Sequence, residues 1–180
     1  MDDSFSGIGL PTKSRVTLAY HEPTRTVIVH VESPFELPPR RRLFFRWATD
    51  THYQPVATFP ENISIDSFVV DTPRPALYFI TFTWKARPGR KTASGNWDAL
   101  YRFDLNKHRS ERLTGRGDLR PPDGVDETWL NAILSVSNDG HSIFCNAALL
   151  TQRCAEYWIC ELDLGNMRLR PVTRLDAVFA

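Results

Sequence analysis

The sequence repeats its hydrophobic pattern three times, and this repetition constrains the fold more than any other feature. The three units span about residues 16–58, 62–114 and 131–173, and each begins with a strand pattern, a tight polar turn and a second strand pattern. Tyr20–Val29 aligns without gaps with Val70–Phe79 at an offset of 50 residues, and Val70–Phe79 aligns with Val136–Cys145 at an offset of 66. Such regular self-similarity indicates one structural unit built three times.

The second halves of the units also align and predict a second hairpin in each. Leu100–Asn106 matches Ile159–Gly165 at an offset of 59, and Phe44–Trp47 matches Leu100–Phe103 at an offset of 56. The offsets change only between the two halves, so the variable piece is the loop between the second and third strands. The alignment makes three residues equivalent packing positions of the third strands: Trp47, Phe103 and Leu162.

Each unit therefore predicts four antiparallel strands joined by tight turns. The turn Asn138-Asp139-Gly140 is typical of a hairpin because Asn and Gly tolerate a positive φ, and Pro23 and Pro73 serve the other two turns through their fixed φ. We expect an all-β fold, with residues 1–180 as a single domain of three four-stranded antiparallel repeats. The same alternation also fits a β-sandwich or a barrel, which is the alternative.

The third unit resembles the repeat of TolB-like and other WD40-like β-propellers. The resemblance rests on Leu134–Phe144 with its Asp-Gly turn, on Tyr157–Leu164 and on Arg170–Thr173. The second unit keeps Leu100–Leu105 and Arg112–Thr114 but lacks the Asp-Gly turn, and the first keeps only the hydrophobic skeleton. The resemblance implies blade-like units of a partial propeller. It implies no activity, because propellers carry many functions.

Three blades are few for a propeller, since closed propellers usually have about four to eight. A disc of three would leave strand edges unpaired, which proteins generally avoid. We therefore expect a homodimer that completes six blades as one solution. Two other solutions are possible. The chain is a fragment of a longer propeller, or it caps its strand edges with its own termini.

Composition and motifs point away from several classes of function. The 22 basic and 21 acidic residues leave a net charge of +1, so no global field favours nucleic acid or a membrane. The three cysteines form no CxxC pair, and no His-rich, nucleophile-elbow or phosphate-loop motif is present, so we expect no cofactor. No secretion signal or spanning segment is visible, which predicts a cytoplasmic protein without a membrane partner.

The loops between the second and third strands carry mostly basic residues, although the chain as a whole is nearly neutral. In blades these loops emerge on one face, so they predict a basic binding surface for an acidic protein or another anionic partner. Trp97 closes the longest loop and is expected to stack on the partner. The predicted binding residues are Arg40, Arg41, Arg42, Lys85, Arg87, Arg90, Lys91, Trp97 and Arg153.

These features favour a non-enzymatic protein-binding or assembly module. Two alternatives stay open at this point. One is a propeller-type hydrolase with a metal site at the channel mouth, for which Asn62, Asp66 and Asn131 are the available ligands. The other is a β-barrel that binds a small ligand.

Overall fold

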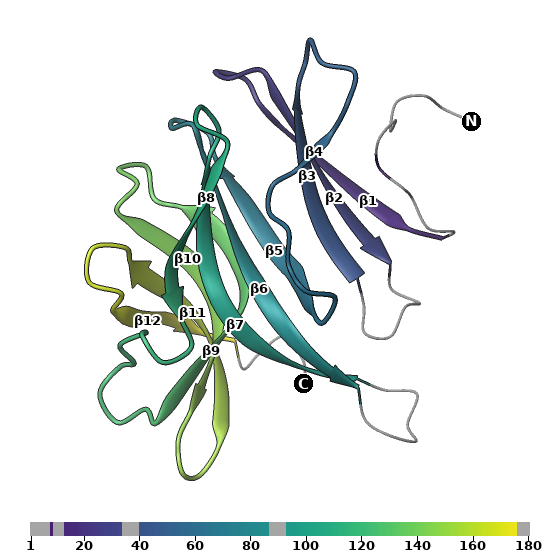
Figure 1. Cartoon of the computed structure of the whole chain (residues 1–180). Coiled ribbons are helices and arrows are strands. Elements are labelled where there is room, and N and C mark those ends of the chain that lie inside the picture. Colours follow the sequence, from purple (N-terminus) through teal and green to yellow (C-terminus); the bar gives the residue numbers. More distant parts are fainter. Residues whose placement is uncertain (1–7, 9–12, 34–39, 87–92, 176–180) are drawn as a thin grey trace.

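The computed structural model describes residues 8, 13–33, 40–86 and 93–175, and in this part the chain forms twelve strands and no helix (Figure 1). The strands make three sheets of four. The first sheet contains β1 (Arg15–His21), β2 (Thr26–Ser33), β3 (Arg40–Trp47) and β4 (Gln54–Pro55). The second contains β5 (Ile63–Asp71), β6 (Ala76–Ala86), β7 (Ala93–Asp104) and β8 (Arg109–Gly115). The third contains β9 (Glu127–Val136), β10 (Ser142–Leu150), β11 (Ala155–Asp163) and β12 (Leu169–Arg174).

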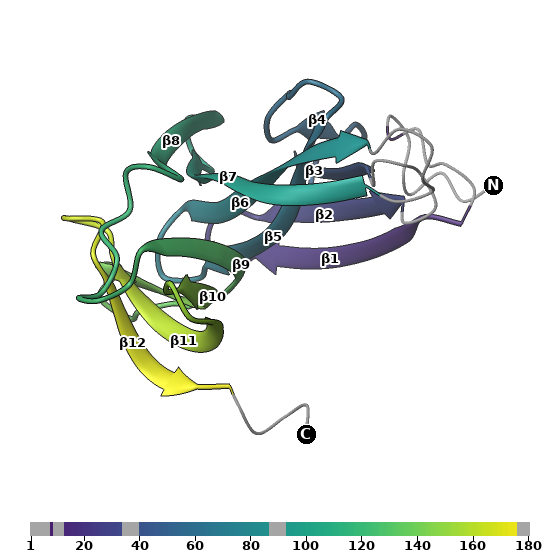
Figure 2. The same ribbon diagram turned by 90° about the horizontal axis from the view of Figure 1, so that it is seen from below.

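Each sheet is an antiparallel meander whose strands follow one another in chain order. Figures 1 and 2 show the second sheet lying between the first and the third. This arrangement is a partial β-propeller of three blades, numbered here in chain order, and it confirms the predicted all-β fold with three four-stranded repeats rather than a sandwich or a barrel. No helix in the described residues could cross a membrane.

The turns show the repeat at atomic detail in blades 2 and 3. The carboxylate of Asp104 accepts hydrogen bonds from the backbone N–H groups of Asn106 and Lys107 at 2.9 and 3.0 Å. Asp163 accepts the equivalent bonds from Gly165 and Asn166 at 2.8 and 3.3 Å. The two third strands also pair at equivalent places, Phe103 with Leu77 and Leu162 with Ile143. The offsets read from the sequence for these two blades are therefore confirmed.

The predicted equivalence of Trp47 with Phe103 is wrong by one residue. Trp47 pairs with Thr26, and the equivalent of Thr26 in blade 2, Ala76, pairs with Asp104. Phe103 and Leu162 are almost fully buried, whereas Trp47 is half-buried. The sequence could not fix this register because β3 buries three consecutive residues, Leu43–Phe45, and so shows no alternation.

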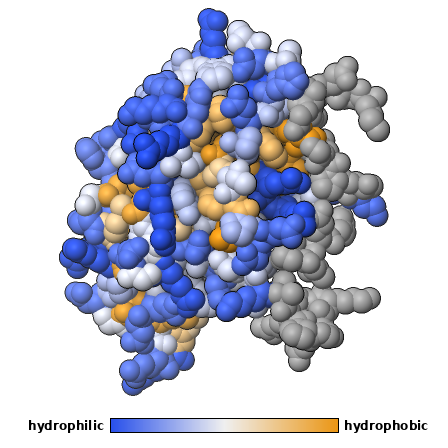
Figure 3. Space-filling model, viewed as in Figure 1, coloured by the Kyte–Doolittle hydropathy of each residue, from blue (hydrophilic) through white to orange (hydrophobic). Residues whose placement is uncertain are grey.

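The core lies between the blades, and alternate residues of each strand face opposite neighbours. At the first junction, between blades 1 and 2, Ile28 and Phe45 pack against Leu77, Phe79 and Phe103. At the second junction, between blades 2 and 3, the buried residues include Tyr78, Ile80, Trp97, Leu100, Ile143, Cys145, Cys160 and Leu162. In Figure 3 apolar residues reach the surface in patches among hydrophilic ones.

Two of the three thiols belong to the second junction. Cys145 and Cys160 are neighbours on paired strands, and both are fully buried. Burial raises the pKa of Cys145 well above its usual value and that of Cys160 to about 11, so both stay protonated and unreactive near neutral pH. Cys154 is exposed in the turn between β10 and β11.

Candidate functional site

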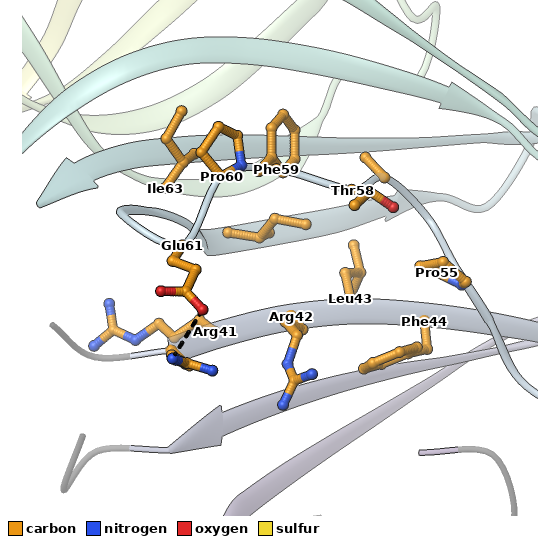
Figure 4. Close-up of a pocket in the computed structure, with 13 residues that line it drawn as sticks. Arg41, Arg42, Leu43, Phe44, Pro55, Thr58, Phe59, Pro60, Glu61 and Ile63 are labelled. Carbon is orange, nitrogen blue, oxygen red and sulfur yellow. Dashed lines mark hydrogen bonds and ion pairs between the residues drawn. The ribbon is translucent and has the colours of Figure 1, made fainter. Parts of the chain in front are cut away.

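A cleft of about 360 Å³ opens at the first junction, between β3 and the segment that leads into β5 (Figure 4). Its apolar lining includes the buried Leu43 and Ile65 and the more accessible Pro55, Phe59 and Pro60. The three consecutive arginines that begin β3, Arg40–Arg42, line it as well. A hollow with an apolar floor and a few charged groups is the usual form of a binding site.

The shortness of β4 creates this cleft. β4 pairs with β3 only at Phe44 and Phe45, so the beginning of β3 has no strand beside it on that edge. The chain then turns away, held by a hydrogen bond from the N–H of Val56 to the carbonyl of Leu43 at 2.9 Å and by one from the Ser110 hydroxyl to the carbonyl of Val56 at 2.8 Å. Phe59 and Pro60 consequently form a wall opposite Arg40–Leu43 instead of a fourth strand.

Arg41 is a structural ion-pairing residue that ties the two blades together. Its Nε and Nη2 donate to Oε1 of Glu32 on the neighbouring strand at 2.9 and 2.8 Å. Its Nη1 is ion-paired with Asp66 on β5 of blade 2. The three side chains are only 19–23% exposed, so this network is largely shielded and Arg41 has little freedom to bind a partner.

Arg40 and Arg42 are on the other side of β3 from Arg41, as strand alternation requires. In Figure 4 Leu43 points toward the wall of the cleft, and Arg42 points away from it. The Arg40 guanidinium lies 3.5 Å from the carboxylate of Glu61, with side chains 46% and 87% exposed. Arg40 therefore reaches Glu61 on the far wall from the solvent side of the cleft, whereas the exposed side chain of Arg42 points away from the cleft.

His30 closes the junction beneath Arg41. Its Nε2 donates to the backbone carbonyl of Ile65 on β5 at 3.0 Å, and its ring lies against Phe68 with centroids 5.6 Å apart. Burial, more than any neighbouring charge, lowers the pKa of His30 below its usual value. The imidazole is therefore neutral at pH 7 and carries its proton on Nε2.

The other predicted binding residues do not join this cleft. Lys85 is exposed near the end of β6 on blade 2, and Arg153 is exposed in the β10–β11 turn on blade 3. Arg87, Arg90 and Lys91 lie outside the described residues. The predicted stacking role of Trp97 is wrong, because this side chain is 1% exposed and packs into the second junction opposite Phe82.

One of the residues proposed for a channel metal, Asp66, has its carboxylate engaged by an arginine. Asp66 is ion-paired with Arg41, the backbone carbonyl of Asn62 accepts from the N–H of Trp84, and Asn131 lies at an irregularity of β9. Among the residues that the structure describes, no group of three His, Cys, Asp or Glu side chains is arranged to hold a metal ion.

Sequence reasoning missed the far wall of the cleft, formed by Phe59, Pro60 and Glu61. These residues fall in the connection between two units, where neither periodicity nor a motif marks them. The prolines and the aromatic residue in this short connection are the signal that could have suggested a rigid wall. Only the fold places that wall opposite the arginines.

Comparisons with known proteins bear on the fold alone. No protein-family model matches the sequence, and no curated protein matches it. The chain is similar to the crystal structure of a GH74 xyloglucanase from Xanthomonas campestris, with a TM-score of 0.51 and 15% identity, covering 91% of this chain and 22% of that one. It also matches a putative dipeptidyl aminopeptidase IV from Bacteroides ovatus, with a TM-score of 0.36, 11% identity and coverages of 91% and 28%.

Both of these proteins have propeller folds. The chain spans less than a third of the length of either. The likeness to the xyloglucanase thus agrees with the blade architecture and carries no activity over to this chain.

Proposed function

We propose that this chain is a non-enzymatic binding or assembly module that holds an acidic protein segment at the first junction. The observation that carries the proposal is the cleft itself, which combines an apolar lining with Arg40 at its solvent side, and Arg42 is exposed next to it on the same strand. Carboxylates suit the guanidinium groups, and apolar side chains beside those carboxylates suit the floor. The repeat pattern of blade 3 supports a place for this scaffold among TolB-like or other WD40-like propellers.

A protein partner fits this cleft better than a nucleic acid does. The accessible apolar lining of the cleft comes from Pro55, Phe59 and Pro60, and only one of these three is an aromatic ring on which a base could stack. The net charge of +1 supplies no long-range attraction for a polyanion. The exposed Lys85 and Arg153 would extend the same preference along blades 2 and 3, and a cytoplasmic location is part of this proposal.

The experiment measures binding of a short fluorescein-labelled peptide rich in Glu and Leu by fluorescence anisotropy. In the variant Arg40→Glu with Arg42→Glu, we expect the Kd to rise about ten-fold or more, because two charge-assisted contacts become repulsive. Raising the salt concentration should shrink the difference between variant and unaltered protein, since exposed charges are screened. Arg41 is left unchanged because its ion pairs hold the two blades together.

A matched control reverses Lys107 and Arg109 to Glu, two exposed positions on blade 2 away from the cleft. This control should leave the Kd of the peptide unchanged, and both variants should keep the original melting temperature. Equal weakening by the two variants would show a nonspecific charge effect and contradict the site. Stronger binding of a single-stranded oligonucleotide than of the peptide would contradict the class of partner.

A further inference from the structure

The large apolar side chains left exposed gather at the two ends of the row of blades. Among the described residues they are Val16, Leu18 and Tyr20 on β1 of blade 1, and Leu134, Tyr157 and Val172 on blade 3, each 36–59% exposed. None lies on blade 2, which has a neighbour on each side. Clusters of exposed apolar residues usually mark contact surfaces.

The exposed side chains of blade 1 occupy positions that are packed in blade 2. By strand pairing, Leu18 corresponds to Phe68 and Tyr20 to Val70, because their partners Val29 and Val27 correspond to Phe79 and Leu77. Phe68 and Val70 pack against the cluster of the first junction. Leu18 and Tyr20 therefore belong to the face that receives a neighbouring blade, and no blade among the described residues covers that face.

Two of the exposed side chains of blade 3, Tyr157 and Val172, occupy positions that are packed at the second junction. Tyr157 pairs with Ala148 as Trp97 pairs with the corresponding Phe82, yet Tyr157 is 54% exposed and Trp97 is 1% exposed. Other residues of blade 3 are likewise more exposed than their counterparts in blade 2. They lie on the second and third strands and at the bulge of the fourth strand. The further corresponding pairs are Phe144 and Tyr78, Ile159 and Leu100, and Val172 and Leu113.

The two open faces are thus the two complementary halves of one blade junction. Blade 3 presents the half that blade 2 presents to blade 3, and blade 1 presents the half that blade 2 presents to blade 1. Ile8 and Tyr53 already cover Val29, Val31 and Phe44 on the outer part of the blade 1 face. The inner strand β1, where an adjacent blade makes its central contacts, is left uncovered.

We propose that the occupant of both faces is a second copy of this chain, packed head to tail. Blade 3 of each copy then covers β1 of the other through two identical junctions related by a two-fold axis. Six blades lie within the range of about four to eight found in closed propellers. A second copy fits because each copy brings both halves of the missing junction, so one association buries both open ends at once.

Sedimentation equilibrium of the 180-residue chain at micromolar concentration tests the assembly. We expect a particle of twice the 20.6 kDa chain mass. Leu18→Lys and Tyr157→Glu alter exposed positions on opposite ends, so each variant should fold and should dissociate to the monomer. Gln54→Glu, at an exposed position on β4 away from β1, is the control and should remain dimeric.

Mixing the two variants distinguishes head-to-tail packing from other dimers. The mixture contains one intact junction and one in which the new Lys faces the new Glu, so a heterodimer should form where neither variant dimerises alone. A strict monomer of the unaltered chain would overturn the proposal, and so would a larger ring. A dimer unaffected by either variant, or one that mixing does not restore, would overturn the head-to-tail junction.

Discussion

The two blade junctions of this molecule are built from the same repeat but differ in how closely they are packed. The second junction is filled by large apolar residues, with Trp97, Leu100 and Leu162 buried almost completely. The first has a comparable buried centre around Phe45 and Phe103, but it opens beyond Leu43 into the cleft of about 360 Å³. The repeat thus supplies a packed junction, and the loss of most of one strand, β4, converts the edge of another junction into a site.

The polar contacts across the two junctions also differ. At the second junction, Ser67 exchanges hydrogen bonds with the backbone N–H and carbonyl of Ile133 at 3.1 and 3.4 Å. Arg74 donates to the carbonyls of Ser137 and Asn138 at 2.9 and 3.3 Å. At the first junction the contacts are made by His30, by the Arg41–Asp66 ion pair and by the Ser110 hydroxyl. The first junction therefore depends on protonation and charge more than the second does.

The largest expected effect compares equivalent core positions at the two junctions. Phe103→Ala should lower the free energy of unfolding by about 3–5 kcal/mol and Leu162→Ala by about 2–5 kcal/mol, because both remove a nearly fully buried side chain. Trp47→Ala should cost less than Phe103→Ala, since Trp47 is half-buried and not equivalent. Urea denaturation monitored by circular dichroism measures all three. An equal loss for Trp47→Ala and Phe103→Ala would restore the alignment read from the sequence.

A smaller effect is expected at the turn of blade 3 that receives Arg74. Gly140 has a φ of +74°, and a methyl group there would meet the Arg74 guanidinium. Gly124 has a φ of +82° but open space around it, so it is a matched control for backbone strain alone. Gly124→Ala should cost about 1–2 kcal/mol.

Gly140→Ala should cost more than Gly124→Ala, because it also displaces Arg74 from the carbonyls it binds. Thermal denaturation of the two variants measures the difference. With Arg74→Ala in the background, the two glycine substitutions should become alike. An equal loss from the two in the unaltered background would mean that Arg74 contributes nothing to the second junction.

The smallest effect is a pH dependence of the first junction. Burial lowers the pKa of His30, so the folded protein resists protonation there, whereas the unfolded chain takes up the proton near pH 6.5. The contribution of His30 is therefore fully present above about pH 6.5 and is lost as the pH falls toward the lower pKa of the folded state. Arg41 opposes protonation, and Glu32 favours it.

His30→Gln keeps an N–H donor for the Ile65 carbonyl but removes the titration. Below pH 6.5 the unfolding free energy of the unaltered protein should fall more steeply than that of the variant, by at most about 1.4 kcal/mol per pH unit. Urea titrations at several pH values measure the two slopes. Parallel slopes would show that His30 does not titrate differently in the folded and unfolded states.

Much of the fold was predictable because blades are made of local hairpins. The turns at Asp104 and Asp163 and the strands beside them follow from short segments, so the alignment of blades 2 and 3 is correct to the residue. The register of β3 was not predictable, because its buried run gives no alternation. The site was predicted only in part: Arg40–Arg42 line the cleft, whereas Trp97 is a core residue.

The sequence by itself determined the three sheets, since period-two patterns and turn residues act within a few residues of one another. Tertiary structure alone decided which face of each strand meets which blade. It divided Arg41 from Arg40 and Arg42, buried Trp97, and set Phe59 opposite Leu43. The physical reason is that alternating apolar residues show that a strand has two faces, but do not show which part of the molecule packs on each face. What covers each face depends on the packing of residues far apart in the chain.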